Sequence, residues 1–145
     1  MNTGPIRDSI TLETTAGFIA LMVEAGVGTW NEDGIYQPDD WGIVVGRLPH
    51  TPAKLIGVTP YVSRVDAQPR VDERAIQVRY RSASPDPRPL IILVDRLHDH
   101  IHGLSNINLG GHHVPLIWRH SLADLGADQN NQYEITDNYY FYLDK

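Results

Sequence analysis

The clearest hydrophobic pattern of the chain lies in residues 71–81. From position 76 on, apolar and polar side chains alternate one by one, in the order Ile76, Gln77, Val78, Arg79, Tyr80 and Arg81. A period of two places successive side chains on opposite faces of a β-strand. The pattern therefore predicts a strand with one apolar face and one polar face.

A helical pattern follows directly, after a turn that is rich in proline. Asp86 can cap the helix, and Pro87 or Pro89 suits its first turn, where a backbone N–H has no partner inside the helix. Apolar positions then recur at helical spacings: Leu90, Ile91, Val94, Leu97 and Ile101. We expect this apolar stripe to pack on the apolar face of the strand, with the remaining segments around them.

Shorter patterns predict the other elements of the chain. Residues 8–25 favour a helix whose first free N–H groups Asp8 or Ser9 can satisfy. The helix should end at Gly26 or Gly28, because glycine readily adopts the left-handed conformation of a helix C-terminus. Further strands are expected at 35–36, 42–48, 54–62, 104–109, 114–122 and 133–143.

The order of these elements indicates one α+β domain over residues 1–145. Its mainly antiparallel, mixed β-sheet should have two main α-helices packed against one face. Pro60 places the segment 54–62 at a sheet edge or a strand end, because proline cannot donate to the ladder. The last two strands should form a long hairpin. We expect flexible loops at 28–41, 63–71 and 126–132.

Composition excludes several classes of protein. The 145 residues carry a net charge of −6 without a block of like charge, which argues against a dedicated nucleic-acid binder. The chain has no cysteine, which excludes disulfides, cysteine-ligated zinc and a thiol nucleophile. No apolar run approaches 18 residues, so no transmembrane helix is predicted. A mildly acidic domain made inside the cell is expected.

Histidines near the end of the second predicted helix are candidate metal ligands. His98 and His102 are four residues apart, a spacing that can chelate on one helix face. A third ligand would have to come from His112 or His113, and no Glu accompanies them as the general base of an H-E-x-x-H motif. The alternative is that these imidazoles complement the negative end of the helix dipole.

Other signatures of catalysis are missing. The sequence contains no G-x-S-x-G motif, and the aspartates near residue 40 lack the spacing of an EF-hand. Gly110–Gly111 lacks the further glycine and the lysine of a phosphate loop, so a hairpin turn is expected there. The residues themselves therefore predict no catalytic residue and no cofactor.

Two groups of side chains are candidates for contacts between molecules. Arg79 and Arg81 share the polar face of their strand and could meet acidic groups of a neighbouring subunit or line a pore. Tyr140 and Tyr142 lie on the polar face of the last strand, and tyrosine is enriched at protein interfaces. Solvated arginines, and tyrosines present for their β propensity, are the alternatives.

Six segments of the chain form an ordered set: WGIVVGRLPHTP (41–52), IGVTPY (56–61), VDERAIQVRYR (71–81), DRLHDHIHGL (95–104), WRHS (118–121) and LGADQNNQYEITDNYY (125–140). Taken in this order, they resemble the minor capsid or tail terminator proteins of long-tailed bacteriophages, most closely those of phages that infect actinobacteria. The resemblance covers roughly residues 6–143. It implies a structural protein without a catalytic residue or cofactor.

The resemblance also implies a place in the virion. It implies a hexameric ring at the head-proximal end of the tail tube, which ends tube polymerisation and docks the head-completion, stopper or adaptor proteins of the connector. DNA would pass through the lumen without specific binding, and no membrane is involved. The alternatives are a head-completion stopper and, from a different class, a metal-dependent enzyme that uses His98, His102 and His112 or His113.

Overall fold

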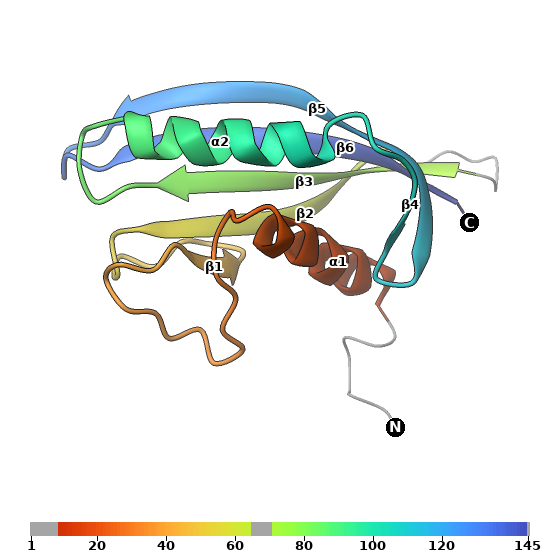
Figure 1. Cartoon of the computed structure of the whole chain (residues 1–145), viewed down its shortest axis with the longest axis horizontal. Coiled ribbons are helices and arrows are strands. Elements are labelled where there is room, and N and C mark those ends of the chain that lie inside the picture. The colour runs from red at the N-terminus through yellow and green to blue at the C-terminus, as the bar shows by residue number, and fades with distance from the viewer. Residues whose placement is uncertain (1–8, 65–70, 145) are drawn as a thin grey trace.

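The computed structural model describes residues 9–64 and 71–144, and of residues 62–64 the backbone alone (Figure 1). In chain order the elements are α1 (Ile10–Glu24), β1 (Gly42–Val45), β2 (Leu55–Arg64), β3 (Val71–Arg81), α2 (Arg88–Ile101), β4 (Ser105–Leu109), β5 (His112–Ala127) and β6 (Tyr133–Asp144). No helix in these ranges is long and apolar enough to cross a membrane.

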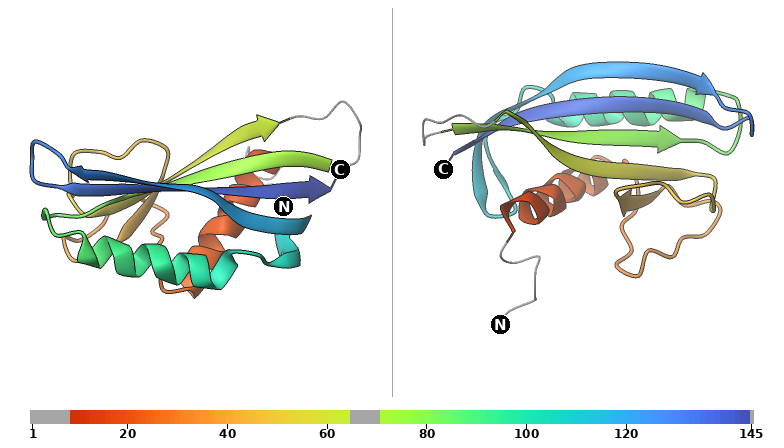
Figure 2. Two further views of the ribbon diagram at one scale, coloured as in Figure 1. Left: turned by 90° about the horizontal axis from the view of Figure 1, so that it is seen from above. Right: turned by 180° about the vertical axis from the view of Figure 1, so that it is seen from behind.

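The strands form one six-stranded sheet in the order β1-β2-β3-β6-β5-β4. β1 is parallel to β2, and the other neighbouring pairs are antiparallel. The sheet curves into a half-barrel, and both helices pack on its concave side (Figures 1 and 2). The predicted α+β class, with a mainly antiparallel mixed sheet and two helices against it, is confirmed.

The strand and the helix predicted first have the expected relation. Ile76, Val78 and Tyr80 of β3 are at most 1% exposed and join the core, together with the buried stripe of α2. That stripe consists of Leu90, Leu93, Val94, Leu97 and Ile101. Including Ile91 in it was wrong, since this side chain is 44% exposed. At 100° per residue Leu93 lies nearer the centre of the stripe.

Both helix starts use side-chain oxygens. Ser9 caps α1 by accepting a hydrogen bond from the Leu12 N–H at 3.2 Å. Pro87 occupies the N-cap position of α2, so the predicted cap at Asp86 lies one residue too early. Asp86 still accepts from the Arg88 N–H at 3.0 Å, which satisfies one free donor of the first turn.

α1 lies against the turn between β4 and β5 with backbone touching backbone. A Cβ on Gly17 would lie 2.4 Å from the Gly110 nitrogen, and a Cβ on Gly110 would lie 1.9 Å from the Glu13 carbonyl oxygen. The hairpin turn predicted at Gly110–Gly111 is confirmed, with φ of 56° and 93°. These glycines let the helix close the concave side of the half-barrel.

The strand predicted at residues 35–36 is wrong. This stretch is irregular, and hydrogen bonds from side chains take the place of hydrogen bonds between strands. The Tyr36 hydroxyl donates to the Ile43 carbonyl at 2.7 Å and accepts from the Asn31 N–H at 2.8 Å. Asp33 accepts from the Ile35 N–H at 2.9 Å. Tyr36 itself is buried, so it anchors the segment to β1.

Two boundaries differ from the prediction. β5 runs from His112 to Ala127, so the connector of the long hairpin is shorter than 126–132. Of the predicted loop 63–71, residues 65–70 lie outside the described residues, and positions 63, 64 and 71 belong to strands. Pro60 lies beyond the part of β2 that pairs with β1, so its predicted edge position is confirmed.

Candidate functional site

The convex face of the sheet carries the residues that the sequence singles out for contacts. Neighbouring residues across a sheet share a face, and Tyr139, Ile135 and Val78 face the core. The side chains that alternate with them point away from the helices. We call this surface the outer face; it comprises Tyr61, Gln77, Arg79, Trp118, His120, Asn138, Tyr140 and Tyr142.

Aromatic rings gather at one end of the outer face. Tyr140 stacks on His120 at 4.0 Å between ring centroids and meets Trp118 edge-on at 6.0 Å. Trp118 also lies 4.9 Å from Tyr142, and Tyr61 lies 6.4 Å from Tyr140. Such pairs contribute about 0.5–1.5 kcal/mol each beyond the area that they bury. We call these five residues the aromatic cluster.

A small residue makes the cluster possible. Ala75 is the cross-strand partner of Tyr61 on one side and of Tyr140 on the other. Its methyl group leaves room for the two rings to meet above it, and Ala75 is 1% exposed as a result. The rings therefore bridge strands that do not pair with each other.

Hydrogen bonds fix the orientation of the cluster. The Tyr61 hydroxyl donates to Asn138 Oδ1 at 3.1 Å, and Asn138 Nδ2 donates to Ser121 Oγ at 3.1 Å. Burial, and secondarily Tyr140, raise the pKa of Tyr61 to about 12. A phenol is protonated at neutral pH with its ordinary pKa too, and the raised pKa extends the range in which Tyr61 can donate to the amide to alkaline pH.

The cluster still offers accessible area. Tyr61 is 38% exposed and Tyr142 is 37% exposed. Contacts with the neighbouring rings hold both side chains in place. Fixed aromatic side chains with an exposed edge contribute large contact area at a small cost in conformational entropy. This arrangement suits a protein partner.

The two predicted arginines occupy different environments. The Arg79 side chain is 47% exposed and its Nε donates to Glu134 Oε1 at 2.5 Å. Arg81 is 7% exposed and donates to the carbonyl oxygens of Ala53 at 2.6 Å and Pro52 at 3.0 Å. Arg81 therefore holds the turn before β2, and Arg79 is the arginine that a partner can reach.

A polar pocket of about 330 Å³ lies around these arginines. Arg47, Arg79 and Arg81 line it, with Glu134 as the acidic lining residue. Three guanidinium groups against one carboxylate give the pocket a positive character. It suits a carboxylate of another protein better than a base of DNA, because base readout needs side chains that reach into a groove.

The histidine candidates do not form one site. His98 and His102 stack with ring centroids 4.5 Å apart, and His102 Nδ1 accepts the backbone N–H of Arg119 at 2.9 Å. His112 is the first residue of β5, seven positions before Arg119, and its Nε2 lies 3.0 Å from Glu13 Oε1. Over residues 9–64 and 71–144, no three His, Asp or Glu side chains are grouped to hold a metal ion.

One buried ion pair was missed from the sequence. Arg119 Nε lies 2.9 Å from Asp137 Oδ1, and Asp137 is fully buried. The signal was present, because Asp137 falls in phase with Ile135 and Tyr139 on the apolar face of β6. A charged residue in such a phase requires a partner, but the sequence does not tell which strand supplies it.

A model of the family described as "Bacteriophage tail terminator protein" matches residues 21–145. The chain belongs to this family. The predicted resemblance to tail terminators is confirmed, and it identifies the protein as a structural component of the phage tail, located in the virion. No curated protein sequence matches the chain. The closeness to phages of actinobacteria stays a prediction.

A solved structure shares the fold of this tail terminator. It is described as "Virion of native gene transfer agent (GTA) particle" and superposes with a TM-score of 0.63, covering 99% of this chain and 100% of that chain. The two sequences are 5% identical, so the likeness is one of fold. The family match itself includes the six strands and α2, and therefore the whole described outer face.

Proposed function

We propose that this tail terminator forms a closed ring, a hexamer, at the head-proximal end of the tail tube. The observation that carries the proposal is the family match over residues 21–145. One axial face of the ring would bind the last ring of tail tube protein, and the other would bind a head-completion, stopper or adaptor protein. Because the two axial faces differ, tube protein cannot add beyond the ring.

The outer face supplies protein contacts in this proposal. The aromatic cluster, with Tyr140 and Tyr142, offers fixed apolar area to a neighbouring protein of the tail. Arg79 offers one exposed guanidinium for an acidic group, while Arg81 acts through the turn that it holds. The loop 28–41 and the tip of the β5–β6 hairpin are proposed to reach the axial partners.

The negative charge of the chain agrees with a conduit for DNA. A net charge of −6 disfavours tight binding of phosphates, and a tail has to let DNA pass through its lumen. We therefore propose passage without specific recognition. High affinity of the purified ring for duplex DNA at physiological salt would contradict this part of the proposal.

A polymerisation assay tests the function. Purified tail tube protein is allowed to polymerise with and without the terminator, and tube lengths are measured by negative-stain electron microscopy. The proposal predicts shorter tubes whose growing ends carry an added ring. Unchanged tube growth, together with binding to portal or adaptor rings, would instead identify a head-completion stopper.

A further inference from the structure

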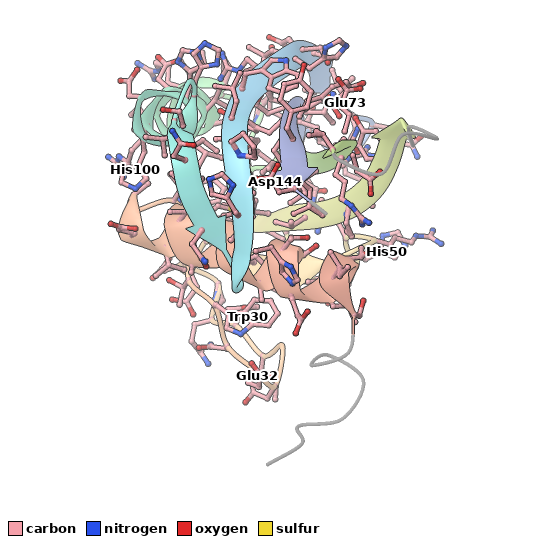
Figure 3. The ribbon with its side chains drawn as sticks, turned by 90° about the vertical axis from the view of Figure 1, so that its right-hand side faces the viewer. Trp30, Glu32, His50, Glu73, His100 and Asp144 are labelled. Atoms are coloured by element: carbon pink, nitrogen blue, oxygen red, sulfur yellow. The ribbon has the colours of Figure 1, made fainter. Side chains whose placement is uncertain are left out.

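An apolar groove runs along the outward side of α1. Its helix wall consists of residues spaced by four, four and three positions, which share one helix face: Leu12, Ala16, Ala20 and Val23. Trp30 and Val45 also line the groove, and Figure 3 shows Trp30 with Glu32 below α1. The groove encloses about 520 Å³.

The groove exists because α1 is apolar on two faces. Phe18 and Met22 are fully buried against the sheet, whereas Leu12 is 36% exposed and Val23 is 44% exposed. A helix that is apolar on most sides is normally covered on most sides. The Trp30 indole N–H donates to Glu32 Oε2 at 2.8 Å, and this bond keeps the indole oriented in the groove.

A second exposed apolar surface lies where α2 borders β5. It consists of Ile91, Ile92, Leu122 and Leu125, which are 44–55% exposed, and we call it the α2–β5 ridge. Among the described residues, no strand pairs with the outer edge of β5 beyond Arg119, since β4 pairs with residues 112–116. Leu122 and Leu125 therefore stand on an open edge.

The helix and strand parts of the ridge are neighbours. Arg119 Nη2 donates to the Val94 carbonyl at 3.4 Å, and the Arg119 N–H donates to His102. These two bonds hold α2 against β5, and Figure 1 shows that the two elements run in opposite directions. The backbone N–H of Arg119 lies level with His102 at the end of α2. The eleven positions from His102 back to Ile91 rise about 16.5 Å, or about five strand residues, so Ile91 lies beside the part of β5 that holds Leu122 and Leu125.

We propose that the α2–β5 ridge of one subunit inserts into the α1 groove of the next copy of this chain. The inference rests on the proposed ring and names its lateral contact. α1 and β1 lie at one side of the molecule and α2 with β5 at the opposite side (Figures 1 and 2). A head-to-tail contact between two unlike surfaces is the type that closes into a ring.

Size and chemistry favour this occupant. A cavity of about 150 Å³ takes up a benzene molecule, so a groove of about 520 Å³ has room for several leucine or isoleucine side chains. The four ridge residues are uncharged and so are the groove residues of α1. One contact per subunit therefore covers both exposed apolar surfaces of every copy, and a closed ring leaves neither surface open.

Disulfide cross-linking tests the contact, because the chain has no cysteine of its own. Val23→Cys and Leu125→Cys are introduced into separate copies, which are mixed, added to tail tubes and oxidised. The proposal predicts a covalent dimer in the mixture and its loss when either variant is oxidised alone. Val23→Cys mixed with Ser105→Cys, an exposed position on β4, is the control and should give no dimer.

A charge in the groove gives a second readout. Ala20→Asp should abolish the cross-link while the thermal unfolding midpoint changes little, since Ala20 is exposed. Ala83→Asp, at an exposed turn, is its matched control and should leave the cross-link intact. Equal cross-linking in both variants would overturn the proposal.

The outcomes separate this contact from the proposed function. If the protein caps tubes but no covalent dimer forms between Val23→Cys and Leu125→Cys, the proposed contact is wrong and the proposed terminator ring is unaffected. The same holds if Val23→Cys forms a dimer when it is oxidised alone. If the protein does not cap tubes, the function fails, and the contact is then decided by oxidising the free protein near its solubility limit. A dimer there supports the contact, and its absence overturns it.

Discussion

Arg119 of β5 and Asp137 of β6 form a bidentate ion pair on the side of the sheet that α2 covers. The two nitrogen–oxygen distances are 2.9 and 3.1 Å, and Arg119 also donates to the Val94 carbonyl of α2. Burial raises the pKa of Asp137, and the guanidinium opposes this shift by favouring the carboxylate. The pair thus links β5, β6 and the helix, and it sets how α2 sits on the strands.

Removing the arginine should be costly. Arg119→Met leaves the Asp137 carboxylate buried without its partner, and we expect a loss of about 3–5 kcal/mol in the free energy of unfolding. Arg119→Met combined with Asp137→Leu should recover most of this loss, because no buried charge remains. Urea unfolding of the three proteins measures both values. Equal stability of the single and the double variant would contradict the assignment.

The turn between β4 and β5 offers a comparison of two glycines. Both have positive φ, but a Cβ on Gly110 would collide with the Glu13 carbonyl, whereas a Cβ on Gly111 has no atom within 4 Å. Gly111→Ala should cost about 1–2 kcal/mol from its left-handed conformation. Gly110→Ala should cost clearly more, because α1 has to move away. A similar loss for both variants, in thermal unfolding, would argue against the close packing of α1.

The raised pKa of Tyr61 makes a prediction at alkaline pH. An unfolded tyrosine loses its proton near pH 10, while Tyr61 keeps it in the folded protein up to about 12. The folded state therefore binds the proton more tightly, and this contribution to stability is full below pH 10 and is lost as the pH rises through about 12. Tyr61→Phe should reduce the fall in stability over this window. Denaturant unfolding at several pH values measures this change, and an unchanged pH dependence would contradict the raised pKa of Tyr61.

The separation of the histidines predicts weak metal binding. His98 and His102 can supply two ligands, and His112 is engaged with Glu13 elsewhere. We expect less than one equivalent of zinc in purified protein, measured by elemental analysis. Stoichiometric zinc that is lost in a His98→Ala variant would revive the metal-dependent alternative.

Most helices and strands could be predicted because the spacing of apolar residues within one segment depends on that segment alone. Alternation marked β3, and helical spacing marked most of the α2 stripe. The error at Ile91 arose because this residue follows Leu90 directly. Around the helix Ile91 lies about 100° from Leu90, whereas Leu93 lies only about 60° from it on the other side, so Leu93 is buried and Ile91 is exposed. The stretch 35–36 looked like a strand because Ile35 and Tyr36 are adjacent apolar residues between turn-forming residues. In the structure, hydrogen bonds of the Tyr36 hydroxyl with Asn31 and Ile43 hold this tyrosine in place without a strand.

The outer face was predicted in part. Tyr140 and Tyr142 follow from the phase of β6, but Tyr61 and Trp118 join them through the register of β2, β3, β6 and β5. A single sequence does not contain the register of strands that are distant in the chain. The exposure of Arg79 and the burial of Arg81 differ for the same reason, since the turn that covers Arg81 comes from a distant segment.

Cryo-electron microscopy of tail tubes capped by the purified terminator tests the proposed ring. We expect six copies of the chain in one closed ring at the head-proximal end of the tube, with no tube protein beyond it. A ring found at the opposite end of the tube, or tube protein continuing past the ring, would contradict it.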